Sequence, residues 1–272
     1  MNLATNSVDK GVGNGVDYVS GIERVVGTDF DDVIEGTEAD EVFWGEGGDD
    51  VLSGGAGQDH LVGGAGNDVI DGGDGIDTAH LGYYLTVDPD GSIRADNRTE
   101  HVSVSLHDGV ATTTAGEQDT LINIENVVLE GRVHATVEGS NADNVIEMTE
   151  LAYGNDTING LGGNDTMTGG FGADVFKFEN DKSSGAEENH GKDVITDFTV
   201  GVDKIDLSGT EVYGFEDLLN YDPSAPQSEW GNRYMVQEGD NAVIYTIDGA
   251  QGDSITLENV NMEELSANDF IF

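Results

Sequence analysis

The feature that most constrains how this chain can fold is a nine-residue repeat. Six consecutive units run without insertion from Gly27 to His80, as in GGAGQDHLV and GGAGNDVID, and four more lie at 139–177 with three extra residues at 148–150. We therefore expect a coil in which a six-residue turn alternates with a three-residue strand and units eighteen residues apart stack. Position eight is apolar in every unit and predicts one inward-facing row: Ile34, Phe43, Leu52, Leu61, Ile70, Ala79, Ile146, Ile158, Met167 and Phe176.

Position six carries an oxygen-bearing side chain in every unit. Side chains in stacked units face each other at the strand spacing of about 4.8 Å, where two bare carboxylates repel by roughly 3 kcal/mol at an effective dielectric of 20. Calcium takes oxygen ligands at about 2.3 to 2.6 Å and therefore fits between two such turns. The expected stacked pairs, about six calcium sites, are Asp32 with Asp50, Glu41 with Asp59, Asp50 with Asp68, Asp59 with Asp77, Asn144 with Asp165, and Asp156 with Asp174.

The turn glycines fit the same interpretation, because a sharp turn that brings carbonyl oxygens together needs a residue without a Cβ. Oxygen-only ligation favours a hard cation, and a large, flexible ligand set suits calcium better than magnesium. The predicted calcium-binding residues are Asp31, Asp32, Asp49, Asp50, Gly54, Gly55, Gly57, Asp59, Gly63, Gly64, Gly66, Asn67, Asp68, Gly72, Gly73, Gly75, Asp77, Asn155, Asp156, Gly162, Gly163, Asn164, Asp165, Gly169, Gly170, Gly172 and Asp174.

Calcium binding at these sites should stabilise the folded chain enough to drive its folding. Six independent sites with a Kd of about 1 mM, in about 10 mM calcium, would contribute roughly 8 kcal/mol in total. That is comparable with the whole stability of a domain, about 5 to 15 kcal/mol. We expect a chain that is largely unfolded without calcium and compact with it.

Composition excludes several classes of partner and site. With 55 acidic and 10 basic side chains the net charge is -45, which argues against binding to nucleic acid or anionic lipid. The chain has no cysteine, no apolar run long enough to span a membrane and no leader-like start. No HExxH or GxSxG motif is present, so we expect no catalytic residues in this chain. The six histidines are expected at the surface: His60, His80, His101, His107, His134 and His190.

The chain also repeats a larger unit. Residues 17–27 resemble 119–131, and Met1 falls where a unit is already under way, so we expect a fragment of a longer protein. Hairpins are predicted at Asp90-Gly91 and Asp108-Gly109, and short helices at 215–220 and 262–267. The expected segments are a partial β unit at 1–26, a first repeat block at 27–80, a β-rich linker at 81–138, a second block at 139–178 and a C-terminal β cap at 179–272.

The repeats resemble the RTX (repeats-in-toxin) nonapeptide GGxGxDxUx, and GGAGQDHLV and GGAGNDVID match it at every fixed position. From ADVFKFEN through HGKDVITDFTVGVDKIDLSG, the chain is similar to the C-terminal regions of serralysin-type proteases, alginate epimerase R-modules and RTX adhesins. The resemblance implies an all-β fold, a parallel β-roll in two blocks, with calcium held between successive loops. It also implies export by a type I secretion apparatus, and the ending SANDFIF is similar to the signals that such systems read, although it equally suits a last strand.

Two functional hypotheses follow. The first is a noncatalytic calcium-binding module of a larger secreted bacterial protein, extracellular, folding on calcium outside the cell and carrying the export signal. The alternative is a module that binds a polysaccharide or a cell surface. Trp44, Tyr83, Tyr84 and Trp230 provide aromatic rings for sugar stacking, although aromatic residues beside strands more often pack. A free-standing hydrolase or lyase has no supporting motif.

Overall fold

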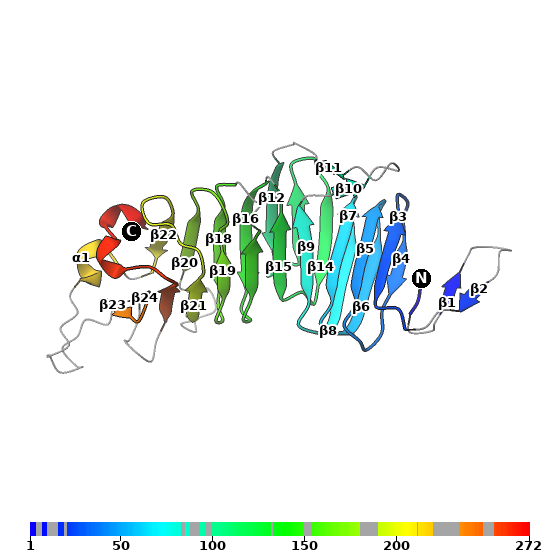
Figure 1. Ribbon diagram of the computed structural model, residues 1–272, viewed down its shortest axis with the longest axis horizontal. Helices are drawn as coiled ribbons and strands as arrows, with labels where there is room; N and C mark the ends of the chain where they lie inside the picture. The colour runs from blue at the N-terminus through cyan, green and yellow to red at the C-terminus, as the bar shows by residue number, and fades with distance from the viewer. Residues whose placement is uncertain are drawn as a thin grey trace. The chain divides into compact units, whose positions relative to one another are not determined.

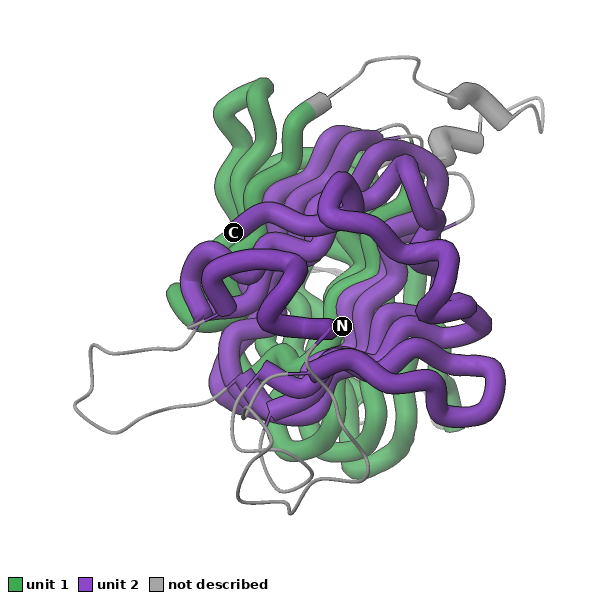
Figure 2. Tube along the Cα trace, turned by 90° about the vertical axis from the view of Figure 1, so that its left-hand side faces the viewer, with its two compact units in different colours: residues 1–133 green, residues 134–272 purple. Residues whose placement is uncertain are grey.

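The computed structural model describes residues 1–3, 7–9, 16–18, 21–82, 85–87, 93–95, 100–131, 133–149, 154–179, 190–210, 212–219, 234–246 and 253–272. These residues form two compact units, residues 1–133 and 134–272, which Figure 2 colours separately. Within each unit the chain winds through stacked strands that lie side by side (Figure 1). The expected all-β roll of mainly parallel strands is confirmed.

Unit 1 contains two stacks of strands. One holds, in spatial order, β4 (Val33–Glu35), β6 (Val51–Gly57), β8 (Val69–Gly75), β14 (Gln118–Ile122), β13 (Val110–Thr113) and β12 (Glu100–Ser105). The other holds β3 (Arg24–Thr28), β5 (Val42–Gly47), β7 (His60–Ala65), β9 (Thr78–Gly82) and β15 (Asn126–Glu130). Two further antiparallel pairs are β1 (Ser7–Asp9) with β2 (Val16–Tyr18), and β10 (Leu85–Val87) with β11 (Ile93–Ala95).

Successive repeats alternate between the two stacks, so two repeats make one coil. Val33 pairs with Val51 and Val51 with Val69, all in parallel, which confirms the predicted stacking at eighteen residues. The apolar row at position eight is buried as expected, with Ile34 2 % exposed and Leu52 and Leu61 fully buried. The rows of the two stacks together form the core between them.

The prediction of three-residue strands is wrong in the middle of the first block. Strands β6 and β8 have seven residues and β7 has six, because the parallel ladder continues into the turns. Gly55 pairs with Gly73 and Gly57 with Gly75. Gly55 has a φ of 109°, and a Cβ there would lie 2.2 Å from the carbonyl oxygen of Thr37 on the coil below. Only glycine lets the turn backbones approach this closely.

The segment after the first block returns to the same stacks. The hairpin predicted at Asp108-Gly109 is confirmed, since β12 and β13 are antiparallel and Ser105 pairs with Val110. The turn at Asp90-Gly91 lies outside the described residues, although its flanking strands β10 and β11 are antiparallel. Strand β14 then pairs in parallel with β8, and β15 with β9.

Unit 2 repeats the arrangement. One stack holds β16 (Val133–Ser140), β18 (Thr157–Leu161), β20 (Val175–Glu179), β22 (Lys204–Gly209) and β26 (Phe270–Ile271), all parallel. The other holds β17 (Val145–Met148), β19 (Thr166–Thr168), β21 (Lys192–Ile195), β25 (Ser254–Leu257), β24 (Asn241–Tyr245) and β23 (Tyr234–Glu238), the last two antiparallel. Val145 pairs with Thr166, twenty-one residues away, so the three-residue insertion is absorbed without disturbing the stack.

Short helices occur in unit 2 where the sequence predicted them. Helix α1 spans Phe215–Leu218, and the predicted segment at 262–267 forms the 3-10 helices η2 (Met262–Glu264) and η3 (Ala267–Asp269). The terminal residues Phe270 and Ile271 form β26, which pairs with β22 and closes this stack.

Candidate metal centre

The position-six side chains form a second buried row, which the sequence did not predict. Nine of them, all except the half-buried Asp32, are at most 1 % exposed: Glu41, Asp50, Asp59, Asp68, Asp77, Asn144, Asp156, Asp165 and Asp174. The turns therefore enclose their carboxylates as completely as the strands enclose the apolar core. An ionised carboxylate in such a place is costly unless a partner compensates its charge.

One oxygen of most of these carboxylates accepts a hydrogen bond that joins two coils. The backbone N–H of Asp50 donates to Asp68 Oδ1 at 2.8 Å, and that of Asp59 donates to Asp77 Oδ1 at 2.8 Å. The structure stacks all six predicted pairs in this way, through the bonds Asp32 to Asp50, Glu41 to Asp59, Asp50 to Asp68, Asp59 to Asp77, Asn144 to Asp165 and Asp156 to Asp174.

The second oxygen has no such partner. The Oδ2 atoms of Asp50, Asp59, Asp68, Asp77, Asp165 and Asp174 are buried and accept no hydrogen bond from the described residues. Burial raises the pKa of Asp59 to about 6, of Asp68 to about 7 and of Asp165 to about 8, and neighbouring carboxylates add to the rise. A buried acceptor left unsatisfied costs about 1 to 3 kcal/mol, and more when it is charged. These oxygens are therefore the natural ligands of a cation.

The position-one glycines Gly45, Gly54 and Gly72 show that a carbonyl oxygen of another turn lies close to the Oδ2 atoms of their own turns. A Cβ built on Gly45 would lie 2.2 Å from both Asp50 Oδ2 and the carbonyl oxygen of Gly63 on the next coil. A Cβ on Gly54 would lie 2.1 Å from Asp59 Oδ2. Carboxylate and carbonyl oxygens thus converge from adjacent turns without nitrogen or sulfur, which is the donor set of a hard cation such as calcium. The residues present fit calcium.

Three repeats differ, because their own turn satisfies the position-six side chain. Thr28 donates to Asp32 Oδ2 from its backbone N–H at 2.7 Å and from its hydroxyl at 2.9 Å. The same contacts join Thr37 to Glu41 and Ser140 to Asn144. Position two is threonine or serine in these three repeats, and glycine, glutamate or leucine in the six repeats whose Oδ2 lacks a partner. The residue at position two therefore separates the two kinds of turn.

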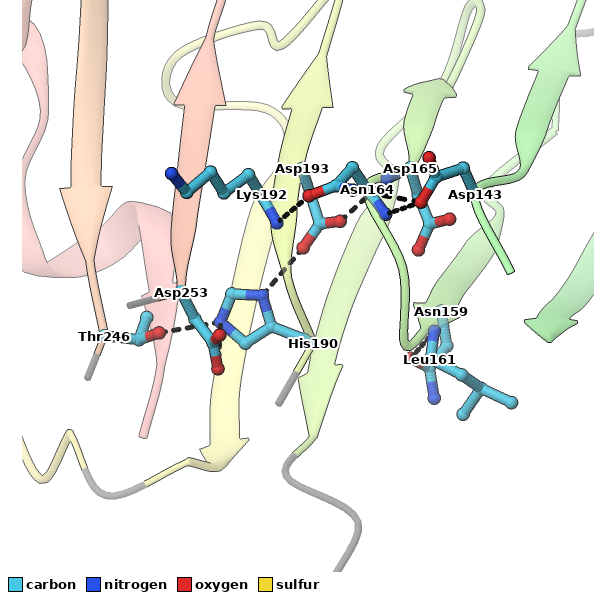
Figure 3. A network of polar contacts seen from close by, with 10 residues as sticks. All are labelled: Asp143, Asn159, Leu161, Asn164, Asp165, His190, Lys192, Asp193, Thr246 and Asp253. Carbon is cyan, nitrogen blue, oxygen red and sulfur yellow. Dashed lines mark hydrogen bonds and ion pairs between the residues drawn. The ribbon is translucent and has the colours of Figure 1, made fainter. Parts of the chain in front are cut away.

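The position-five side chains named as ligands lie on a different row. Asp31, Asp49, Asn67, Asn155 and Asn164 are exposed, and their side chains bind the backbone of neighbouring coils. Asn67 N–H donates to Asp49 Oδ1 at 2.9 Å, and this bond with the Asn67 amide lowers the pKa of Asp49. The position-five side chain accepts a hydrogen bond from the following coil, whereas the position-six side chain accepts one from the preceding coil. The pKa of Asp49 is accordingly lowered, whereas that of the buried Asp68 is raised. Figure 3 shows the row continuing from Asp143 through Asn164 to Lys192.

The glycines predicted as ligands lie in the stacked turns. Most of those at positions two and four take positive φ, and they lie in the turns that stack on the preceding coil, as Gly64 does against the Glu46 carbonyl, whereas Gly75 and Gly172 do not take positive φ. Those at position one, including Gly63, Gly72 and Gly169, lie against the carboxylate of their own turn. The remaining members of the predicted set are Gly55, Gly57, Gly66, Gly73, Gly75, Gly162, Gly163, Gly170 and Gly172, all in the same turns.

The carboxylate row continues beyond the nonapeptides, which the sequence analysis missed. The backbone N–H groups of Asp68, Asp77, Asp165 and Asp174 donate to Asp119, Glu125, Asp193 and Asp203, respectively, at 2.8 to 3.0 Å. A signal for three of these residues was present: an aspartate followed two residues later by a buried apolar residue, the spacing of positions six and eight. It occurs as Asp119 with Leu121, Asp193 with Ile195 and Asp203 with Ile205.

A buried histidine ends this row in unit 2 (Figure 3). His190 is 1 % exposed, so its predicted surface position is wrong. Its Nδ1 lies 2.7 Å from Asp193 Oδ2 and its Nε2 lies 2.7 Å from Thr246 Oγ1. The imidazole thus satisfies the Asp193 carboxylate as threonine does in the first repeats. The Oδ2 of nearby Asp253 is buried without a hydrogen bond among the described residues, 4.0 Å from His190 Nε2.

Comparison with known families agrees with the geometry. A model of the RTX calcium-binding nonapeptide repeat matches this chain in four copies, over residues 17–52, 44–79 and 152–176. These are RTX repeats. The matched ranges contain the turns of all six repeats in unit 1 and those of Asp156, Asp165 and Asp174 in unit 2, and the resemblance inferred from the sequence is confirmed. The RTX repeat binds calcium and is not itself catalytic.

Two solved structures resemble the chain only loosely. The extracellular lipase of Serratia marcescens is 17 % identical with a TM-score of 0.34, covering 96 % of this chain, which spans 41 % of that chain. A subunit of the Azotobacter vinelandii mannuronan C5-epimerase is 21 % identical with a TM-score of 0.23, covering 97 % of this chain and 86 % of that one. Both scores are too low to carry an argument about function. No curated protein matches the chain.

None of the helices in the described residues has the length and apolar character needed to cross a membrane. The same residues contain no group of three or more His, Cys, Asp or Glu side chains placed to hold a metal.

Proposed function

We propose that this chain is a noncatalytic calcium-binding module, part of a larger secreted protein, which folds when calcium enters its stacked RTX turns outside the cell. One observation carries the proposal. Carboxylate oxygens that are buried, unpaired and next to carbonyl oxygens recur along the repeats. Without a cation this row opposes folding, and with a cation it joins adjacent coils.

The ligands that we propose are the position-six carboxylates with a free Oδ2, together with carbonyl oxygens of the glycine-rich turns. A bound calcium ion would supply positive charge between two coils. The chain's residues hold the turns in register through the Oδ1 bonds and keep water from the carboxylates. We assign the position-five side chains to joining the coils, and we assign no calcium to the position-six side chains that threonine or serine satisfies. The proposed carboxylate ligands are Asp50, Asp59, Asp68, Asp77, Asp165 and Asp174.

We place this module outside the cell because of the affinity class that such sites suggest. Extracellular calcium modules bind with Kd values of about 10⁻⁴ to 10⁻³ M, so their sites stay empty in the cytosol and fill on export. Passage of an unfolded chain through a type I secretion apparatus fits this order of events. The C-terminal residues would carry the export signal in addition to forming β26. Fusing 253–272 to a reporter in a cell with such an apparatus tests this role, which fails if the reporter stays inside.

The alternative, a polysaccharide- or surface-binding module, has less support. Of the four aromatic residues named for it, only Trp44 lies within the described residues, where it is partly exposed on β5. An anionic glycan would also meet a strongly negative surface, so calcium would have to bridge the two.

The proposal is tested by comparing Asp68→Asn with Asp49→Asn, the same change in two rows of one block. The Asp68 substitution removes a carboxylate with a buried, unpaired oxygen, whereas position five already holds asparagine at Asn67. In a calcium titration followed by far-UV circular dichroism and hydrodynamic radius, Asp68→Asn should shift the folding midpoint to higher calcium and Asp49→Asn should not. Equal midpoints in both variants, or strand content that a chelator leaves unchanged in the parent chain, would refute the proposal.

A further inference from the structure

Two histidines distant in sequence meet on the outer face of unit 1. His60 lies on β7 and His80 on β9, which are neighbouring parallel strands in Figure 1. The strand register pairs His60 with Thr78, so His80 is its diagonal neighbour two residues further along. His60 Nδ1 lies 2.9 Å from His80 Nε2, and the ring centroids are 5.2 Å apart. Two imidazole nitrogens therefore face one another across the strands.

This spacing is close to what a chelated metal ion needs. Tetrahedral zinc with nitrogen ligands at about 2.0 to 2.1 Å holds two of them about 3.3 Å apart. The two rings would separate by about 0.4 Å relative to the 2.9 Å found, and His60 is exposed and free to move that far. Burial lowers the pKa of His80 to about 4, with a smaller contribution from His60. A neutral imidazole has one ring nitrogen with a lone pair, which is the group that binds a transition metal.

The surroundings of the pair favour a cation. Glu130 on β15 lies with Oε1 3.9 Å from Nδ1 of His80, on the side of the ring away from His60. A carboxylate behind a ligating imidazole orients the ring and raises its basicity. The chain's charge of -45 raises the local concentration of any divalent cation. Imidazole selects borderline metals, whereas calcium prefers oxygen.

We propose that His60 and His80 form a binding site for a borderline divalent transition metal, such as Zn²⁺ or Cu²⁺, on the outer face of unit 1. The site is chemically separate from the calcium rows, which offer only oxygen and lie inside the turns. Its protein ligands are the two imidazole nitrogens, and water completes the coordination. The site needs unit 1 to be folded, and it does not depend on which turns hold calcium.

The test uses the full chain folded in excess calcium, which also occupies the carboxylate sites. Substoichiometric Cu²⁺ should give an electron paramagnetic resonance spectrum with superhyperfine splitting from two nitrogens, and Zn²⁺ should bind in isothermal titration calorimetry. We expect His60→Ala and His80→Ala each to leave one nitrogen at most and to weaken Zn²⁺ binding at least about tenfold. The matched control is His107→Ala, an exposed histidine of the β12–β13 hairpin, which should change neither measurement.

Circular dichroism in calcium shows whether each variant is folded. His60→Ala alters an exposed side chain and remains informative even if His80→Ala does not fold. Unchanged Zn²⁺ affinity and copper spectra in His60→Ala would overturn the proposal, as would equal losses in His107→Ala. Absence of Zn²⁺ binding to the parent chain would show that the two rings only share a hydrogen bond, and would overturn it as well.

Discussion

Replacing Gly45 by alanine adds one methyl group at the point where two coils meet. A Cβ at this position would lie 2.2 Å from both Asp50 Oδ2 and the carbonyl oxygen of Gly63. Gly45 is not among the residues with positive φ, so the backbone itself accepts alanine. The effect of the substitution therefore comes from the two oxygens, which must move away.

The size of the effect follows from these distances. Ordinary contact begins near 3.4 Å, so an oxygen at 2.2 Å has to retreat by about 1.2 Å. Calcium ligands occupy a range only about 0.3 Å wide, so this shift removes the oxygen from coordination. Overpacking costs about 1 to 3 kcal/mol, and the loss of one site costs about 2.7 kcal/mol when calcium is a hundredfold above Kd. We expect Gly45→Ala to lower the unfolding free energy by about 4 to 6 kcal/mol in saturating calcium.

The control lies in the same repeat. A Cβ on Gly47 would have its nearest contacts at 3.7 and 3.9 Å, and Ala65 occupies the equivalent position one coil later. Denaturant unfolding in saturating calcium, followed by circular dichroism, should place Gly47→Ala within about 0.5 kcal/mol of the parent chain and Gly45→Ala far below it. Equal midpoints for the two variants would show that the oxygens around Gly45 are not held in place, and would refute the reasoning about this site.

Three further predictions concern charge, core and the buried histidine. Because burial raises the pKa of Asp68 to about 7, the folded state binds more protons than the unfolded state between about pH 4 and 7, so the residual strand content in chelator, followed by far-UV circular dichroism, should fall from pH 5 to pH 8. A flat or rising profile contradicts this sign. Leu52→Ala, at a fully buried site, should cost about 2 to 5 kcal/mol in calcium, whereas Val51→Ala, 40 % exposed, should cost less than about 1, as thermal melts would show. His190→Ala should cost about 3 to 5 kcal/mol in urea unfolding, and an effect no larger than that of His107→Ala would contradict the bonding described.

Most of the fold could be predicted from the nine-residue period of the sequence. A repeat of nine residues with one apolar position leaves little choice but to alternate between two stacks, and the pairing of Leu52 with Ile70 follows from that spacing. The length of the strands was not predictable from the same pattern. Whether the turn of Gly55 continues the ladder depends on how closely two backbones approach, which is a property of the stack and not of one repeat.

The candidate site was predicted in outline and not in detail. Aspartate at positions five and six looks alike in sequence, yet the Asp49 side chain is exposed and accepts a hydrogen bond from the next coil, whereas the Asp50 side chain is buried and accepts one from the coil before. Local chemistry could have indicated one distinction, since Thr28 four residues before Asp32 is a side-chain donor within reach. The burial of His190 was not predictable, because its partner Thr246 lies fifty-six residues later in the chain and only the fold brings the two together.

The opposed side-chain bonds at positions five and six tie each coil only to the one before and the one after. In a stack linked in this way, the stability of each coil depends on the coils directly next to it. A substitution that unfolds an outer coil shortens the folded stack by one coil. The same substitution near Asp59 or Asp68 divides the stack into two pieces that are too short to remain folded. The harm done by a substitution should therefore depend on its distance from the nearest end of the array as much as on its chemistry.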